Sequence, residues 1–540
     1  GEKKLFLLML LRLHRLYPRT VEALVELVPH YGYFKDWLLL AETLDSVTAE
    51  EHKAAADTLT RRIITLYVSK IEEDAAKLKE ALTEGRTPSL SLAAKWAPRE
   101  NKHFASLAKR MAVAMFPTAQ KQTARALYRK RVAELNGALK TTETLMSAHR
   151  FAEIEWGRVA SLAMNRNRKA FLNENVKGHV AAAHEDTGNR FPEDEDRVAA
   201  RKALRAVLAS AKADKLKGKA LQPHEIVTKI KPAWGKMSAA EDDVLNAQWN
   251  SLREDVRAQL AKAKELQDIE ILGEGAPTAP KATVDLGKLV ALVDVSASMT
   301  GTPMEVAIAL GILTSELTAP AFRHRVLTFE THPRWVTFDA AAGIAAKTRQ
   351  ARHAPWGGST DFAAALEMIL EVAQTSKLKA DEIPDLIVFS DMQFNQAGGA
   401  RWETHLERIR RRFAEVGRKV CGEAYPAPRI IFWNLRANTK GAPATSESEN
   451  VQLLSGFSPS LLKLVLTGAD LVGDEVEVEM SDGTTKMVKQ GPTPFETLRK
   501  ALDGEAFDVV REVISRVGEG PFEGYTFEIG DGFEAIGPGA

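Results

Sequence analysis

Residues 288–298 read KLVALVDVSAS and give the clearest structural signal in the second half of the chain. The apolar run 289–293 has the length of a buried strand and ends at Asp294. Ser296 and Ser298 follow at every second position. This spacing predicts a loop that turns one carboxylate and two hydroxyls toward one point. Such oxygens are the hard ligands that a divalent cation such as Mg²⁺ accepts.

Two later segments repeat this layout. Residues 357–361 (GGSTD) form a glycine-rich turn that contains Thr360, and residues 386–391 (LIVFSD) form an apolar strand that ends at Asp391. In open α/β sheets, ligands lie at the carboxyl ends of the strands, where the strand order reverses, so we expect the three loops to meet there. The alternative interpretation is a Rossmann-like sheet in which these Ser and Asp side chains only cap the following helices.

The order of these residues resembles the metal-ion-dependent adhesion site of von Willebrand factor type A domains. The matching positions are Asp294, Ser296 and Ser298, then Thr360 in a GGSTDF turn, then Asp391. The resemblance implies that the first Asp and both Ser hold the metal directly or through water, that the Thr is a direct ligand, and that the last Asp binds through water. It also implies a site for Mg²⁺, or for Mn²⁺ or Ca²⁺, with an open position for an acidic protein partner.

Strand and helix signals alternate through this half, which predicts a doubly wound, Rossmann-like α/β sheet of the von Willebrand A type. The predicted strands are residues 289–293, 324–329, 334–338, 385–390 and 429–434, and the predicted helices are 303–317 and 361–373.

The first half reads as helices separated by Pro or Gly turns, with apolar faces at helical spacing in residues 5–17 and 21–28. Stacked short helical hairpins of the HEAT type have this layout, although no strict repeat period is visible. Residues 273–280 (GEGAPTAP) are the clearest linker. We therefore predict a HEAT-like helical region over 1–272, an α/β domain over 273–470 and an acidic extension over 471–540.

Length and composition are those of an ordinary globular protein with more than one core. The chain has 540 residues, with 45% hydrophobic and 27% charged. Its formal net charge of +1 gives no overall preference for nucleic acid or membrane, and its single cysteine, Cys421, excludes internal disulfides. The apolar stretch 5–16 is short and interrupted by basic residues. We expect no membrane span and an intracellular, cytoplasmic protein, with an organellar or viral setting left open.

Charge is unevenly distributed along the chain. Residues 95–169 hold sixteen Lys or Arg against five Glu, and residues 470–540 hold sixteen acids against six Lys or Arg. Basic side chains can neutralise phosphates and exposed rings can stack on bases, which favours RNA binding. The alternative is that the basic helices pack on an acidic partner or on the acidic tail, and we favour core positions for Trp96, Tyr128 and Trp156. The predicted RNA-contacting residues are Lys95, Arg99, Lys102, Arg125, Arg129, Lys130, Arg131, Arg158, Arg166, Arg168 and Lys169.

A second resemblance involves residues 91–101 and 128–171. These stretches look like a family of poorly characterised proteins that pair a helical region with a C-terminal von Willebrand A-like domain. That layout is similar to the architecture of the Ro ribonucleoprotein autoantigen family, whose helical-repeat ring binds small structured RNAs. The resemblance therefore implies RNA binding.

The sequence has no Ser-His-Asp order, no Gly-x-x-x-x-Gly-Lys loop and no His-Glu-x-x-His motif. We therefore expect a binding protein and not an enzyme. The first hypothesis is an RNA-binding or ribonucleoprotein scaffold with a metal-dependent partner site. The alternative is a metal-dependent protein interaction module, or a structural subunit of a larger assembly, without RNA. The oligomeric state stays open.

Overall fold

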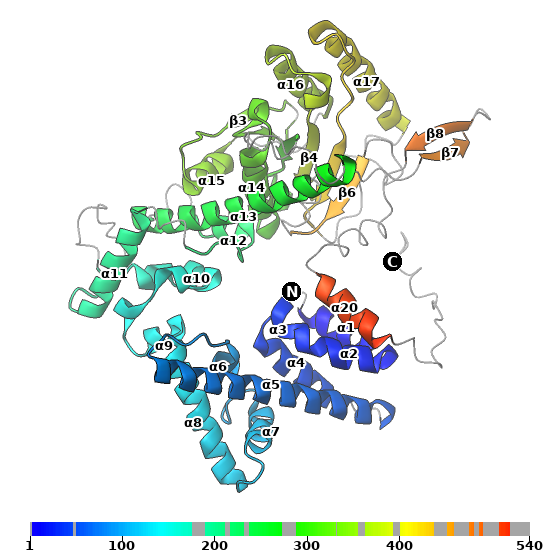
Figure 1. The fold of residues 1–540 in the computed structure, drawn as a ribbon. Coiled ribbons are helices and arrows are strands. Elements are labelled where there is room, and N and C mark those ends of the chain that lie inside the picture. Colours follow the sequence, from blue (N-terminus) through cyan, green and yellow to red (C-terminus); the bar gives the residue numbers. More distant parts are fainter. Residues whose placement is uncertain are drawn as a thin grey trace. The chain divides into compact units, whose positions relative to one another are not determined.

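The computed structural model describes residues 3–46, 50–174, 189–210, 216–231, 237–272, 288–330, 332–354, 362–391, 400–436, 451–457, 475–479, 485–489 and 507–518. The chain forms two compact units. Residues 1–148 together with 502–540 form the first, which we call the helical unit, and residues 149–501 form the second, which we call the sheet unit. Figure 1 shows the elements of each.

The helical unit has one apolar core that draws side chains from most of its helices. Pro18 stands in the first turn of α2, where its missing N–H leaves no bond unmade, and the Asp36 carboxylate accepts a hydrogen bond from Tyr33 N at the start of α4. The helices are α1 Lys3–Leu16, α2 Pro18–Leu24, α3 Val28–Tyr31, α4 Phe34–Asp45, α5 Glu50–Glu84, α6 Ala93–Trp96, α7 Ala105–Met115, α8 Lys121–Leu139, α9 Thr142–Ser147 and α20 Asp508–Val517.

This unit confirms a helical N-terminal region but differs from the predicted run of short helices. Helix α5 is one continuous element of 35 residues, and its buried side chains, among them Leu59, Ile63 and Tyr67, recur at helical spacing. The HEAT-type arrangement stays a prediction. No described helix is both long enough and apolar enough to cross a membrane.

The sheet unit combines a six-stranded sheet with a larger set of helices. Its helices are α10 Ser161–Phe171, α11 Glu195–Leu208, α12 Pro223–Val227, α13 Ala239–Leu272, α14 Thr302–Leu317, α15 Ile344–His353, α16 Phe362–Thr375 and α17 Ala400–Val420. The sheet strands are β1 Leu289–Val293, β2 Arg325–Thr328, β3 Trp335–Thr337, β4 Asp385–Ser390, β5 Ile430–Asn434 and β6 Val451–Ser455. A separate antiparallel pair is formed by β7 Glu475–Glu479 and β8 Thr485–Lys489.

The strand order in the six-stranded sheet is β3-β2-β1-β4-β5-β6. All neighbouring pairs are parallel except β2 with β3. The chain winds outward from β1 to β3 and then returns to the other side of β1 with β4, so the order reverses between β1 and β4. All five predicted strands and the α/β class are confirmed. Strand β6 was not predicted, because its side chains are half-exposed or exposed and give no continuous apolar run.

Helices cover both faces of the sheet (Figure 1). Ala291 and Val293 of β1 share a core with α12, α13, α14 and α15. Val290 and Leu292 share a second core with α16 and α17. Successive side chains of a strand point to opposite faces, so a strand covered on both sides is buried throughout. This explains why the β1 sequence is an unbroken apolar run.

The contacts group the chain differently from the predicted domain borders. Ile226 of α12 and Trp249 and Leu252 of α13 lie in the same core as β1, so these helices belong to the sheet unit although they precede the stretch 273–280, which lies outside the described residues. At the other end, the ring of Phe507 stacks on Tyr31 with centroids 5.8 Å apart, and α20 joins the helical unit. Sequence composition suggested a linker at 273–280, which stays a prediction, but composition does not reveal which core a helix packs on.

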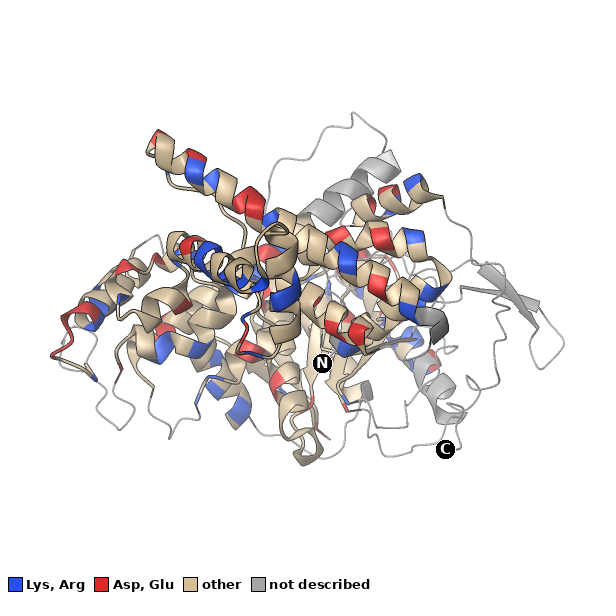
Figure 2. Ribbon diagram, turned by 90° about the horizontal axis from the view of Figure 1, so that it is seen from below, with Lys and Arg blue, Asp and Glu red and all other residues tan. Residues whose placement is uncertain are grey.

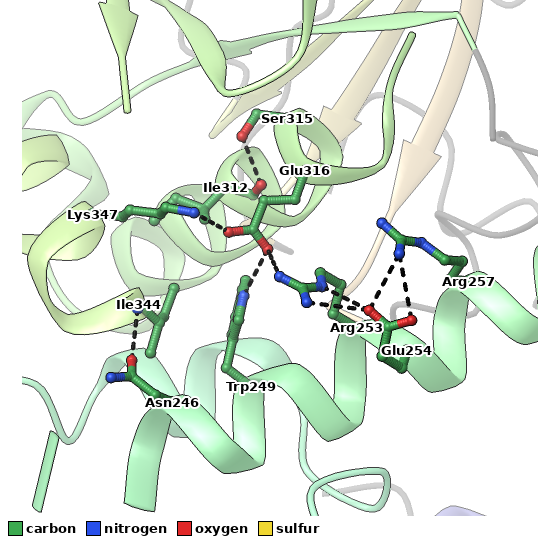
Figure 3. A network of polar contacts seen from close by, with 10 residues as sticks. All are labelled: Asn246, Trp249, Arg253, Glu254, Arg257, Ile312, Ser315, Glu316, Ile344 and Lys347. Atoms are coloured by element: carbon green, nitrogen blue, oxygen red, sulfur yellow. Dashed lines mark hydrogen bonds and ion pairs between the residues drawn. The ribbon is translucent and has the colours of Figure 1, made fainter. Parts of the chain in front are cut away.

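A buried charge network attaches α13 to the sheet unit (Figure 3). Glu316 of α14 is 3% exposed and accepts a hydrogen bond from Lys347 Nζ of α15 at 2.6 Å. Its other carboxylate oxygen accepts one from Trp249 Nε1 of α13 at 2.9 Å and lies 3.6 Å from Arg253 Nη1. Charges this deep are stable only when paired, so the network fixes the position of three helices at once.

Gly311 of α14 lies so close to β1 that a larger residue should destabilise the protein. A Cβ added there would lie 2.5 Å from Val293 Cγ2. We expect Gly311→Ala to lower the free energy of unfolding by about 1–3 kcal/mol, because the methyl group overfills a packed core. Urea unfolding measures the effect. Gly137→Ala in α8 is the control, since a Cβ there meets nothing within 4 Å and the change should add about 0.5–1 kcal/mol. A stabilised Gly311→Ala protein would contradict the expectation.

Candidate functional site

Four of the five predicted metal residues, Asp294, Ser296, Ser298 and Asp391, lie where the strand order reverses. Asp294 directly follows β1 and Asp391 directly follows β4, and these strands pair in register at Val293 and Phe389. The Asp294 backbone N donates to the Phe389 carbonyl at 3.0 Å, which continues the ladder past the end of β1. Asp294 is 2% and Asp391 1% exposed. Two buried carboxylates therefore lie at the crevice where open α/β sheets bind ligands.

The loop after β1 folds back on its own carboxylate. Asp294 Oδ1 accepts a hydrogen bond from Ser296 N at 2.8 Å, and the hydroxyls of Ser296 and Ser298 lie 2.9 Å apart. Ser298 is in the short 3₁₀ turn Ala297–Met299. Gly301 then takes a φ of +100°, which L side chains rarely adopt, and α14 begins. The sequence predicted this convergence of one carboxylate and two hydroxyls, and the structure has it.

Ser390, the last residue of β4, belongs to the same site and was missed. Its hydroxyl donates to Asp294 Oδ2 at 2.7 Å. Burial raises the pKa of Asp294, and the nearby charge of Asp391 acts in the same direction, whereas the hydrogen bonds from Ser296 and Ser390 oppose the shift. The sequence signal that could have identified Ser390 as a site residue is its position directly before Asp391, at the end of β4.

Arg436 is the second residue that sequence reasoning missed. It follows β5 and donates from Nη1 to the Ser298 carbonyl at 2.6 Å. The same Nη1 atom lies 3.6 Å from Asp391 Oδ2. Its backbone is also fixed, because Arg436 N donates to the Asn434 side-chain oxygen at 2.8 Å. Arg436 therefore joins the β1 loop, the end of β4 and the end of β5 at the site.

The donor set fits a hard divalent cation. Carboxylate and hydroxyl oxygens are the ligands that Mg²⁺, Mn²⁺ and Ca²⁺ prefer, and the structure gathers Asp294, Ser296, Ser298 and Asp391 at one edge of the sheet. Among the described residues, no group of three or more His, Cys, Asp and Glu side chains could hold a metal, so the donors here would be a mixed carboxylate and hydroxyl set. Thr360, the predicted direct ligand, lies outside the described residues.

The predicted RNA-contacting residues are divided between the two units. In the helical unit Arg99, Lys102 and Lys130 are exposed, whereas four others pair with acidic side chains. The pairs are Lys95 with Glu143, Arg125 and Arg129 with Glu100, and Arg131 with Glu72. Figure 2 shows acidic and basic residues interspersed along the helices. Part of the local basic surplus is therefore neutralised within the fold.

In the sheet unit the predicted residues have different environments. Arg158 and Arg166 are exposed. Arg168 is only 7% exposed, donates to the Asn165 carbonyl at 2.8 Å and lies 3.3 Å from Glu241, which Lys169 also approaches at 3.9 Å. Burial lowers the pKa of Arg168 and the Glu241 charge opposes that shift. The expected role of Arg168 on an RNA surface does not match this buried, structural position.

The rings interleaved with the basic residues lie mostly in the interior. Tyr128 is 2% and Trp156 6% exposed. The Tyr128 hydroxyl donates to the Pro98 carbonyl at 3.0 Å, and Trp156 packs edge-on against Phe171. Trp96 is half-buried and meets Tyr33 edge-on at 5.0 Å. The core interpretation of Tyr128 and Trp156 is confirmed.

Two family models match the chain, and both are described as domains of unknown function. One (DUF7788) matches residues 288–502 and the other (DUF2828) matches residues 40–181. An uncharacterized protein of Acanthamoeba polyphaga mimivirus is 28% identical over 450 residues, which are 82% of this chain and 69% of that protein. The chain is also similar to the Ro (RSR) protein of Deinococcus radiodurans, with 17% identity and a TM-score of 0.31, over 83% of this chain and 86% of that one. That TM-score is too low to bear on fold or function.

Proposed function

We propose that the chain is a binding protein that holds a divalent cation at the β1–β4 edge and captures an acidic group of a protein partner there. One observation supports this most strongly. Two buried carboxylates, Asp294 and Asp391, lie at the point where the strand order reverses, beside a pair of serine hydroxyls 2.9 Å apart. Helix caps would not require two carboxylates with so little exposure at one place.

The charge balance of the site favours a cation. Burial and the neighbouring Asp391 both raise the pKa of Asp294, so a metal ion that neutralises these carboxylates removes an unfavourable interaction. The two serine hydroxyls and Thr360, in the role that the von Willebrand A resemblance implies, would complete most of the octahedron around Mg²⁺. The remaining position would accept a carboxylate oxygen from a partner. In this proposal the residues bind and orient, and no catalytic step is assigned to them.

Metal binding by the full chain tests the proposal. We expect one Mn²⁺ ion to bind per chain and Mg²⁺ to displace it. Electron paramagnetic resonance of the free Mn²⁺ ion measures the binding. Addition of Mg²⁺ should also raise the melting temperature, because a ligand that binds only the folded state stabilises it. If the chain shows neither Mn²⁺ binding nor a shift of the melting temperature at millimolar metal, the proposal is overturned.

RNA binding by the helical unit is a second candidate function. It rests on a specific observation, namely that Arg99, Lys102 and Lys130 stay exposed although other basic residues of this unit are paired within the fold. Exposed cations of this kind can neutralise phosphates. The alternative is a protein-interaction scaffold without RNA, in which the same residues contact an acidic partner.

A charge-reversal variant separates these alternatives. We expect the triple variant Arg99→Glu, Lys102→Glu and Lys130→Glu to bind a pool of small structured RNAs at least about tenfold more weakly than the unaltered chain at 0.1 M salt, because three phosphate contacts are lost and repulsion is added. Filter binding across a salt series measures this. The control reverses three exposed basic residues of α5, Lys53, Arg61 and Lys79. Equal losses in both variants would indicate a general charge effect, and no binding by the unaltered chain would rule out this function.

A further inference from the structure

We propose that Arg436 is a counter-ion built into the metal site, which competes with the divalent cation and so sets the affinity of the site for it. This inference rests on the proposed metal-binding function. It concerns a residue outside the set Asp294, Ser296, Ser298, Thr360 and Asp391, and it assigns to the site a metal affinity lower than its oxygen donors alone would give.

The contacts place the guanidinium within the site. Nη1 of Arg436 lies 3.6 Å from Asp391 Oδ2 and donates to the carbonyl of Ser298 at 2.6 Å. Asp391 is 1% exposed, whereas the Arg436 side chain is 40% exposed. The carboxylate is therefore fixed in the interior, and the cation that faces it comes from the solvent side on a longer and more adaptable side chain.

A buried carboxylate needs a positive partner. At Asp391 two positive groups can take that role, the Arg436 guanidinium and a bound dication. Without metal, Arg436 supplies that charge to Asp391. A dication held by Asp294 and Asp391 would come close to the same guanidinium, because Arg436 Nη1 lies 3.6 Å from Asp391 Oδ2, and like charges repel strongly in a partly desolvated site. Binding of the metal must therefore overcome this repulsion or move the guanidinium away. Either way the observed affinity is reduced.

The competition also affects what the loaded site would accept. Two carboxylates alone would neutralise a dication, but the additional charge of Arg436 leaves the loaded site with a net positive charge. An anionic ligand is then favoured over water at the open position. Metal and acidic partner would bind more tightly together than separately, and a guanidinium moved off Asp391 could itself pair with the partner's carboxylate.

A structural role for Arg436 gives a different expectation. Its hydrogen bond to Ser298 joins residues 138 positions apart, so the side chain could simply fix the β1 loop. In that case removing the guanidinium would disorder the loop and weaken metal binding. Competition predicts the opposite sign, which makes the two roles experimentally distinct.

The experiment compares Mn²⁺ affinities of full-length variants by electron paramagnetic resonance, with melting temperatures in EDTA as a check on folding. We expect Arg436→Gln to bind Mn²⁺ about tenfold more tightly than the unaltered chain, and Arg436→Lys, which keeps the charge, to stay within about threefold of it. Arg429→Gln is the matched control. Arg429 pairs with Asp385 at 2.8 Å, at the opposite ends of β4 and β5, so its loss should leave the affinity unchanged.

Each result has a definite meaning. Tighter binding by Arg436→Gln alone supports the competition. If the unaltered chain binds Mn²⁺ and Arg436→Gln binds it equally or more weakly, the inference is overturned while the proposed metal site stands. If neither protein binds Mn²⁺ although both melt cooperatively, the metal site and the inference fail together.

Discussion

Replacing Lys347 by Met should destabilise the sheet unit by about 3–5 kcal/mol, because it leaves the Glu316 carboxylate buried without its closest cation. Lys347 and Glu316 are each 3% exposed, with a 2.6 Å separation between Nζ and Oε1. Arg253, at 3.6 Å and 26% exposed, compensates only in part. Thermal unfolding of the full chain should show a transition lowered by several degrees, and hydrogen exchange should accelerate in the first half of α13, which Trp249 attaches to Glu316.

An exposed ion pair provides the control for this prediction. Lys419 and Glu415 of α17 lie 2.6 Å apart, but both are well exposed, so Lys419→Met should leave the melting temperature unchanged. The double change Glu316→Gln with Lys347→Met should recover much of the loss, since no buried charge is then left unpaired. If Lys347→Met melts like the unaltered chain, the buried network does not stabilise the attachment of α13.

Asp294→Asn should reduce the affinity for Mn²⁺ by more than about a hundredfold, since outer-shell partners of a metal site alone contribute about 10–100-fold. The same change should not destabilise the metal-free protein. Burial raises the folded-state pKa of Asp294. Ionisation of this carboxyl therefore lowers the free energy of unfolding as the pH rises above the unfolded-state pKa, and the neutral Asn side chain removes this loss at pH 7. Mn²⁺ titration and melting in EDTA measure the two effects.

The matched change for this prediction is Asp385→Asn, at the other end of β4. Asp385 accepts hydrogen bonds from Arg429 at the amino ends of β4 and β5. Its loss should lower the melting temperature and leave Mn²⁺ affinity intact, the reverse of the pattern expected for Asp294→Asn. If Asp294→Asn binds Mn²⁺ as the unaltered chain does, the ion is held elsewhere.

Local sequence signals predicted the sheet well because its central strands are covered on both faces. Residues 289–293 and 386–389 are apolar throughout, and the predicted limits 289–293 and 385–390 are those of β1 and β4. Strand β6 has half-exposed side chains and left no such signal. The single 35-residue helix α5 was also not predicted, since short helices were expected throughout this half of the chain.

The candidate metal residues could be proposed from sequence because three of them lie within five positions and the others follow strand or turn signals. Ser390 and Arg436 could not be found in the same way. Their roles arise from hydrogen bonds between residues 96 and 138 positions apart, and a single sequence contains no record of such contacts. The basic surplus was visible, but which cations are neutralised by Glu100 or Glu72 depends on helix packing.

The order of the two units along the chain has a consequence for synthesis. During translation, residues 1–148 emerge from the ribosome before the sheet unit. The last described helix of the helical unit, residues 508–517, emerges only after the whole of 149–501. The early helices must therefore wait for their final partner while the sheet unit is completed and folds. A nascent chain stopped near residue 500 should already contain a protease-resistant sheet unit, but its Tyr31 would still lack the ring of Phe507.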